Sequence, residues 1–190
     1  DAVSREFYCD VIMDEASKMN QMVKNLLTLN QLEFGDEDIV FDRFNLTALV
    51  RGVLQSMEIM ADQAGAKILL HTEEDIYAWA DEFKVEQVVK NYVSNACHHV
   101  SGDMVIEVKM VQKDGKVRVS VFNTGTPIPE ADIVHIWIKF YKVDKARTRE
   151  YGGSGIGLSI VKAIMKSFHQ EYGVKNYDNG VEFWFELDVQ

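Results

Sequence analysis

The sequence predicts a mixed α+β domain preceded by one long helix. Residues 5–34 carry apolar side chains in steps of three and four, without glycine or proline, which predicts a long helix. Residues 39–122 alternate short strand patterns with helical ones, and a glycine-rich loop then leads into an amphipathic segment at 155–168. With 190 residues, 47% of them hydrophobic, the chain can bury the core of one ordinary domain and still extend a helix from it.

The first helix has a narrow apolar stripe. Its apolar residues are Phe7, Val11, Ile12, Met19, Met22, Val23, Leu26, Leu27 and Leu29. So narrow a stripe is typical of a helical bundle or coiled coil, so we expect this helix to pair with helices outside this chain. Gly35 predicts its end, and the acidic residues that follow predict a linker. The predicted division is therefore a helix at 1–36 and a second domain at 39–190.

The second domain alternates strands and helices. Its predicted strands lie at 39–44, 67–72, 76–80, 104–112, 117–122, 171–176 and 181–188. Asn45 and Asp81 are predicted caps of helices that end near Ala61 and His99. The pair Asp114-Gly115 predicts a tight hairpin turn.

A long connection lies at residues 123–157. It is rich in glycine, proline, arginine and lysine, and it is longer than the connections that join elements in most compact domains. We therefore expect a functional loop or lid.

Charge and cysteine content exclude several classes of protein. The formal net charge of −10 argues against a broad basic surface, and therefore against nucleic acid as a partner. Cys9 and Cys97 are far apart and lack metal-ligand spacing, so we expect neither a disulfide nor a zinc site, and a reducing cytoplasm fits best. No stretch approaches the roughly 18 uninterrupted apolar residues of a spanning helix. A small anionic ligand such as a nucleotide, with its phosphates held by backbone N–H groups at a helix start, is still possible.

Two asparagines on one helix suggest a metal and phosphate site. Asn91 and Asn95 are one turn apart, so two side-chain oxygens can converge on Mg²⁺ bound to phosphates. Taken alone, either asparagine is more often an ordinary satisfied or exposed helix residue. His98 follows on the same helix, and a lone histidine on a helix surface usually has no special role.

Two further stretches fit a bound nucleotide. The loop at 151–158 is dense in glycine and leads into a helix, so its backbone N–H groups can approach phosphates. It contains no Walker string, and a flexible hinge is the alternative. At Asn123-Thr124-Gly125, a polar side chain can accept from an adenine amino group, although a plain turn fits these residues equally well.

In their order, these units resemble the conserved boxes of sensor histidine kinases. Asn91 and Asn95 resemble the N box; Asn123 and Gly125 the G1 box; Phe140 and Tyr141 the F box; Gly153, Gly155, Ile156, Gly157 and Leu158 the G2 box. The resemblance covers residues 39–190, and the first helix is similar to the second helix of the family's dimerisation and phosphotransfer domain.

The resemblance implies a two-layer α/β sandwich of the Bergerat ATPase type, with a mixed sheet, that binds ATP and Mg²⁺. Asn91 and Asn95 would be the catalytic and metal-binding residues, and the other box residues together with His98 would bind the nucleotide. Lys142 and Arg147, or Arg149, would contact the triphosphate when the lid closes. Solvated lid charges are the alternative for these cations.

The resemblance also implies an activity and partners. The enzyme would transfer the γ-phosphate of ATP to a histidine, for relay to an aspartate of a response regulator receiver domain. We expect a homodimer in the full-length protein, and a cytoplasmic location in a bacterial inner-membrane protein attached through segments outside this chain. None of the five histidines resembles a phosphoacceptor box, so we expect a partial chain that binds ATP without phosphorylating itself.

Departures from the family pattern leave two other functions open. Asn123 stands where the family usually has an aspartate, and Val181 where a hydroxyl residue often supports that aspartate. Ile138 stands where we expect an acidic residue. Asn123, Ile138 and the missing acceptor histidine are the observations that favour the first alternative, a degenerate, non-catalytic ATP-binding or interaction module that regulates a partner kinase. A gyrase-like ATP-hydrolysing clamp is disfavoured, because the amide of Asn91 replaces the glutamate that acts there as general base.

Overall fold

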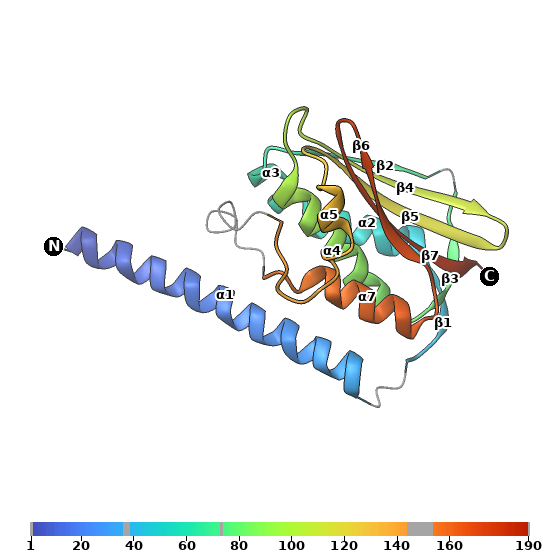
Figure 1. The fold of residues 1–190 in the computed structure, drawn as a ribbon, viewed down its shortest axis with the longest axis horizontal. Helices are drawn as coiled ribbons and strands as arrows, with labels where there is room; N and C mark the ends of the chain where they lie inside the picture. The colour runs from blue at the N-terminus through green and yellow to red at the C-terminus, as the bar shows by residue number, and fades with distance from the viewer. Residues whose placement is uncertain (1, 36–38, 73, 144–153, 190) are drawn as a thin grey trace.

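A mixed seven-stranded sheet with helices against one face forms the body of the protein (Figure 1). The computed structural model describes residues 2–35, 39–72, 74–143 and 154–189. The strands are β1 (Asp42–Asn45), β2 (Lys67–His71), β3 (Tyr77–Ala80), β4 (Val105–Lys113), β5 (Lys116–Thr124), β6 (Tyr172–Tyr177) and β7 (Gly180–Val189). The helices are α1 (Ala2–Phe34), α2 (Leu46–Ser56), α3 (Glu58–Gln63), α4 (Glu82–His99), α5 (Glu130–Ile133) and α7 (Gly157–Ser167).

The strand order is β1-β3-β7-β5-β4-β2, and β6 also pairs with β7. Only the β2–β4 pair is parallel among the described pairs. β6 and β3 share one edge of β7, because β6 pairs with its first residues and β3 with its last two. The predicted α+β class with a mixed sheet is confirmed.

The two faces of the sheet differ in chemistry. Val117, Val119 and Val121 of β5 are buried toward the helices, as the period of two predicts. On the opposite face, Arg118 lies over the ring of Trp184 at 4.0 Å and forms an ion pair with Glu186. The core therefore lies between the sheet and one helical layer, which is the predicted two-layer sandwich.

The predicted local signals are largely present. Asn45 Oδ1 accepts from the backbone N–H of Ala48, and Asp81 Oδ1 from that of Lys84. Asp114 and Gly115 both have positive φ, as a tight hairpin turn of the predicted kind requires. The helix predicted to run to Ala61 is instead two helices, α2 and α3.

The break between α2 and α3 lies at Met57, where φ is −104° and ψ is 4°. The Met57 side chain and Ala61 are both buried in the core. The turn at Met57 keeps the side chains of Met57 and Ala61 on the core side. The spacing of apolar residues is helical on both sides of the turn, so the sequence pattern does not reveal the break.

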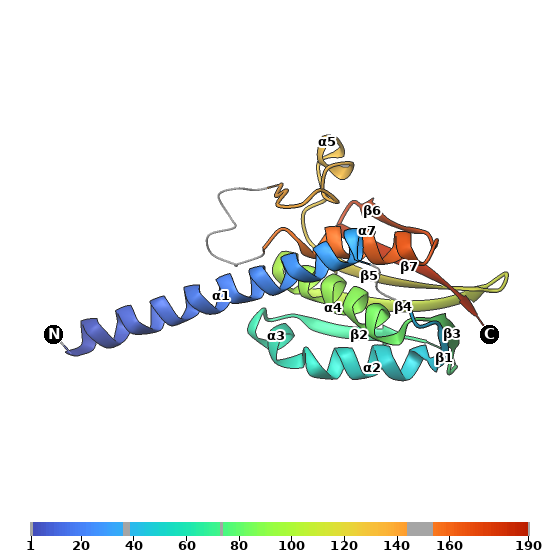
Figure 2. The same cartoon turned by 90° about the horizontal axis from the view of Figure 1, so that it is seen from below.

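The long helix α1 projects away from the domain, with only its last turns beside α7 (Figures 1 and 2). Leu29 is fully buried, whereas the apolar residues nearer the N-terminus, such as Phe7, Ile12 and Val23, are exposed. Among the described residues, no helix combines the length and the apolar character needed to span a membrane.

The C-terminal end of α7 offers a test of backbone strain. His169 has φ of 55°, and the N–H groups of His169 and Gln170 bond to Lys166 O and Met165 O. Left-handed backbone costs a non-glycine residue about 1 kcal/mol. We expect His169→Gly to raise the free energy of unfolding by about 0.5–1 kcal/mol. Urea denaturation measures this, and a loss of stability would show that the exposed imidazole makes a contact worth more than the strain.

Candidate functional site

Helix α4 presents the predicted polar residues beside its buried face. Its valines and Tyr92 point into the core, and the Tyr92 hydroxyl donates to Trp184 O at 3.1 Å. Burial raises the pKa of Tyr92 well above its usual range, so this donor stays protonated. Asn91, Asn95 and His98 are each half-buried at positions three or four residues apart. The core side thus fixes how α4 presents its polar side chains.

Asn91 lies directly against the first residue of α7. A Cβ built at Gly157 would be 2.9 Å from Asn91 Oδ1 and 3.5 Å from its Cγ. Because real Cβ atoms do not approach so closely, the carboxamide occupies space that any other residue at 157 would need. The structure therefore joins the predicted metal residue to the predicted phosphate loop.

The N-terminus of α7 has the features of a phosphate cradle. Its cap position is Ile156, which has no side-chain acceptor, and no side chain caps the helix. The first N–H groups of an uncapped helix need an acceptor, and the helix dipole favours an anionic one. Gly155, with φ of 69°, brings the chain into this helix. Backbone donors beside Asn91 suit a phosphate.

The predicted F-box residues lie against the same loop. The backbone N–H of Phe140 donates to Gly155 O at 2.8 Å, and a Cβ at Gly155 would lie 3.0 Å from Phe140 Cα and 3.4 Å from Lys142 Cε. Phe140 has φ of 64°, a conformation that costs a bulky residue on the order of 1–3 kcal/mol. The residue is 53% exposed, and the atoms of Phe140 nearest to Gly155 belong to its backbone.

The second F-box residue, Tyr141, is held in place through its hydroxyl and its ring. The hydroxyl bonds to the carboxylate of Asp132, and its ring lies 5.4 Å from that of His135. The bond to Asp132 raises the pKa of Tyr141. Asp132 is a contact that sequence reasoning missed.

Asn123 is 3% exposed near the end of β5, where its Nδ2 donates to Thr124 O at 3.1 Å. Val181 lies directly across the sheet and is also buried. A valine offers no hydroxyl, so the amide uses a backbone acceptor instead. Gly125 packs against the end of α4, since a Cβ there would be 2.7 Å from His99 O. Asn123 and Gly125 thus lie close to the end of α4.

His98 has a neighbour that sequence reasoning also missed. Ser94 Oγ and His98 Nδ1 are 3.5 Å apart, one turn along α4. The spacing of four residues is the signal that predicts such a pair. The contact orients the imidazole on the face that carries Asn91 and Asn95.

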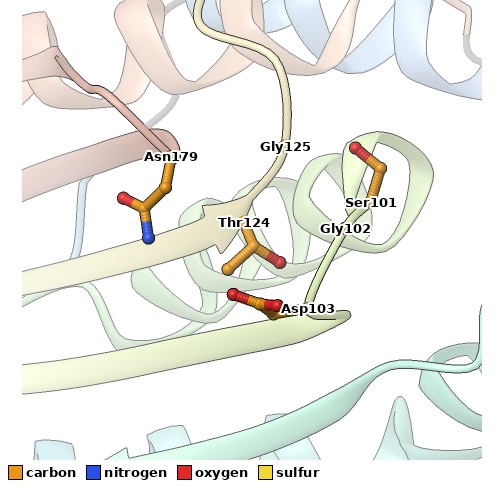
Figure 3. Close-up of a pocket in the computed structure, with 6 residues that line it drawn as sticks. All are labelled: Ser101, Gly102, Asp103, Thr124, Gly125 and Asn179. Carbon is orange, nitrogen blue, oxygen red and sulfur yellow. The ribbon is translucent and has the colours of Figure 1, made fainter.

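A cavity of about 250 Å³ adjoins Gly125 (Figure 3). Figure 3 shows Thr124 and Asp103 at facing strand ends, with Asn179 on the neighbouring turn. The volume is below the roughly 300–1,000 Å³ of ligand pockets, and the Asp103 carboxylate would repel phosphates. This cavity is therefore a poorer candidate for the phosphate site than the space between α4 and α7.

Three of the predicted residues, Arg147, Arg149 and Gly153, lie outside the described residues. Ile156 is fully buried and Leu158 half-buried. Across the described part of the chain, no three His, Cys, Asp or Glu side chains gather as a metal site.

The sheet, the helical layer and the glycine-lined site define a nucleotide-binding α/β sandwich. Residues 80–190 match the family described as histidine kinase-, DNA gyrase B-, and HSP90-like ATPases. The catalytic domain of histidine kinase ThkA has a TM-score of 0.69 and 32% identity, over 78% of this chain and 95% of that one. The chain belongs to this ATPase family and is the ATP-binding catalytic domain of a sensor histidine kinase.

Two curated relatives are also sensor histidine kinases. Sensor histidine kinase WalK of Bacillus subtilis (strain 168) is 29% identical over 83% of this chain, and YkoH of the same organism is 32% identical over 88%. The chain spans only 26% and 36% of their lengths. Full-length ShkA, solved in complex with AMPPNP, shares the fold with a TM-score of 0.83 at 24% identity, over 96% of this chain and 38% of that one.

Proposed function

We propose that this domain binds ATP with Mg²⁺ between α4 and α7 and transfers the γ-phosphate to a histidine. The contact of Asn91 with Gly157 carries the proposal, because it joins an amide oxygen that can bind a metal to backbone donors that can bind phosphate. When bound, Mg²⁺ would neutralise charge on the phosphates. Asn91 and Asn95 would hold the metal, and Asn123 with Gly125 would line the adenine site.

The chemistry favours transfer over hydrolysis. An amide at Asn91 cannot remove a proton from water, so the γ-phosphate is left for another nucleophile. That nucleophile would be an imidazole nitrogen. The new N–P bond forms as the bond to the bridging oxygen breaks, ADP leaves with that electron pair, and the imidazole proton passes to solvent. We place the acceptor histidine outside this chain.

The whole protein's partners are part of the proposal. A crystal structure of ThkA in complex with the response regulator TrrA has a TM-score of 0.77 and 30% identity, over 96% of this chain and 51% of that one. We infer that a receiver domain takes the phosphoryl group here too. We also assign residues 1–36 to a dimerisation helix of a homodimer, and place membrane attachment in segments outside this chain.

Asn95→Ala tests the nucleotide site. We expect its affinity for a non-hydrolysable ATP analogue with Mg²⁺ to fall about tenfold, equivalent to roughly 1.4 kcal/mol, because one metal ligand is lost. Calorimetric titration of both proteins measures this. Absence of binding by the unmodified chain at millimolar nucleotide would support the degenerate module instead, and sustained phosphate release would support the hydrolysing clamp.

A further inference from the structure

The last turn of α1 contacts Lys139, which lies in the long connection at residues 123–157. Glu33 Oε2 and Lys139 Nζ form an ion pair at 2.5 Å between positions 106 residues apart. Leu29, one turn earlier, is fully buried where α1 packs on α7. This end of α1 therefore contacts the catalytic domain through apolar packing and through one ion pair.

Lys139 is connected to the phosphate loop through the next residue in the chain. It precedes Phe140, whose N–H donates to Gly155 O at 2.8 Å. Gly155 is two residues before Gly157, which lies against Asn91. A short series of contacts thus runs from Glu33 to the predicted metal residue.

A groove of about 580 Å³ lies beside this ion pair, between the end of α1, residues 137–139 and α7. Ile138 and Leu32 both line it, and Ile138 is 49% exposed. Ile138 thus adds apolar surface to the groove, at a position where we expected an acidic residue. Trp137 is held by ring contacts with Tyr172 and Phe183, whereas the Lys139 side chain lies at the surface and is restrained by its ion pair with Glu33.

We propose that Glu33 is a positioning residue for ATP binding. It holds Lys139, and through the backbone Phe140 and Gly155, in the arrangement that binds the phosphates. The inference rests on the proposed function, since it concerns the same nucleotide site. The side chains of Glu33 and Lys139 are 31% and 39% exposed, so the effect is modest and falls with salt.

The experiment compares four variants of the chain with the unmodified protein, by calorimetric titration with a non-hydrolysable ATP analogue and Mg²⁺. We expect Glu33→Gln and Lys139→Gln each to weaken binding about three- to fivefold. The exchanged pair Glu33→Lys with Lys139→Glu should restore affinity to within about twofold. Glu15→Gln is the matched control, because Glu15 pairs with Lys18 on the exposed part of α1.

The results separate this inference from the proposed function. If the unmodified chain fails to bind the analogue, the proposed function fails, and the inference with it. If it binds, and Glu33→Gln matches Glu15→Gln or binds more tightly, only the positioning role is overturned. Failure of the exchanged pair to restore affinity would also overturn it, since loss of helix packing alone is not repaired by exchanging charges. At 1 M salt the ratio between the unmodified chain and Glu33→Gln should approach one.

Discussion

Gly157→Ala should lower affinity for an ATP analogue with Mg²⁺ about a hundredfold, equivalent to roughly 2.7 kcal/mol, without unfolding the protein. The new Cβ would lie 2.9 Å from Asn91 Oδ1, so the carboxamide must move away from its position beside the phosphate loop. The methyl group would also narrow the approach to the first N–H groups of α7. The variant thus loses an oriented metal ligand and part of the phosphate cradle together.

Gly157→Ala should not lower the free energy of unfolding, although it lowers nucleotide affinity. Gly157 does not have positive φ, and alanine forms helix more readily than glycine, so unfolding is not expected. Gly52→Ala is the matched control: Gly52 lies in α2 with nothing within 4 Å of a built Cβ. It should add about 0.5–1 kcal/mol of stability and leave nucleotide affinity unchanged.

A double-mutant cycle tests whether Gly157→Ala lowers nucleotide affinity by displacing Asn91. If Gly157→Ala acts by displacing Asn91, it should cost much less affinity in an Asn91→Ala background. Equal losses in both backgrounds would show that the methyl group acts only on the phosphate loop, and that the Asn91 contact is incidental.

The sequence alone predicted the features that depend on neighbouring residues. The caps Asn45 and Asp81 and the turn at Asp114-Gly115 follow from local hydrogen bonding and φ preferences, and the structure has them. The strands also followed from alternation, with differences of one to three residues at their ends. The order of the glycine and asparagine stretches was enough to indicate the family.

Contacts between distant segments could not be predicted in this way. Nothing local links Glu33 to Lys139, because the pair depends on how α1 rests on α7. The space that Gly157 leaves for Asn91 likewise follows from helix packing, and Gly157 alone could as well have been a hinge. The contact of Phe140 with Gly155 is also between distant segments, and it is made by a backbone with φ of 64°.

Asn123→Asp should cost about 2–3 kcal/mol of unfolding free energy at pH 8. Asn123 is 3% exposed and its Nδ2 donates to Thr124 O, so an ionised aspartate would place a carboxylate oxygen against a carbonyl oxygen. Burial and this acceptor both favour the protonated acid, which raises the folded-state pKa above about 3.9 for the unfolded chain. The variant is therefore least destabilised below about pH 3.9, where the aspartate is protonated in both states. It loses stability as the pH rises from there through the higher folded-state pKa.

Val181→Thr should relieve much of this cost. Residue 181 is directly across the sheet from residue 123, so a threonine hydroxyl can donate to the new carboxylate. Alone, Val181→Thr buries a hydroxyl and should cost about 1 kcal/mol. We expect the double variant to be more stable than the sum of the single changes by about 1–2 kcal/mol in urea denaturation at pH 8. Asn20→Asp on the exposed surface of α1 is the control for added charge, and should change stability by less than about 0.5 kcal/mol. Strict additivity would mean that the two positions are not coupled, and that the amide and the valine are separate adaptations of this sheet.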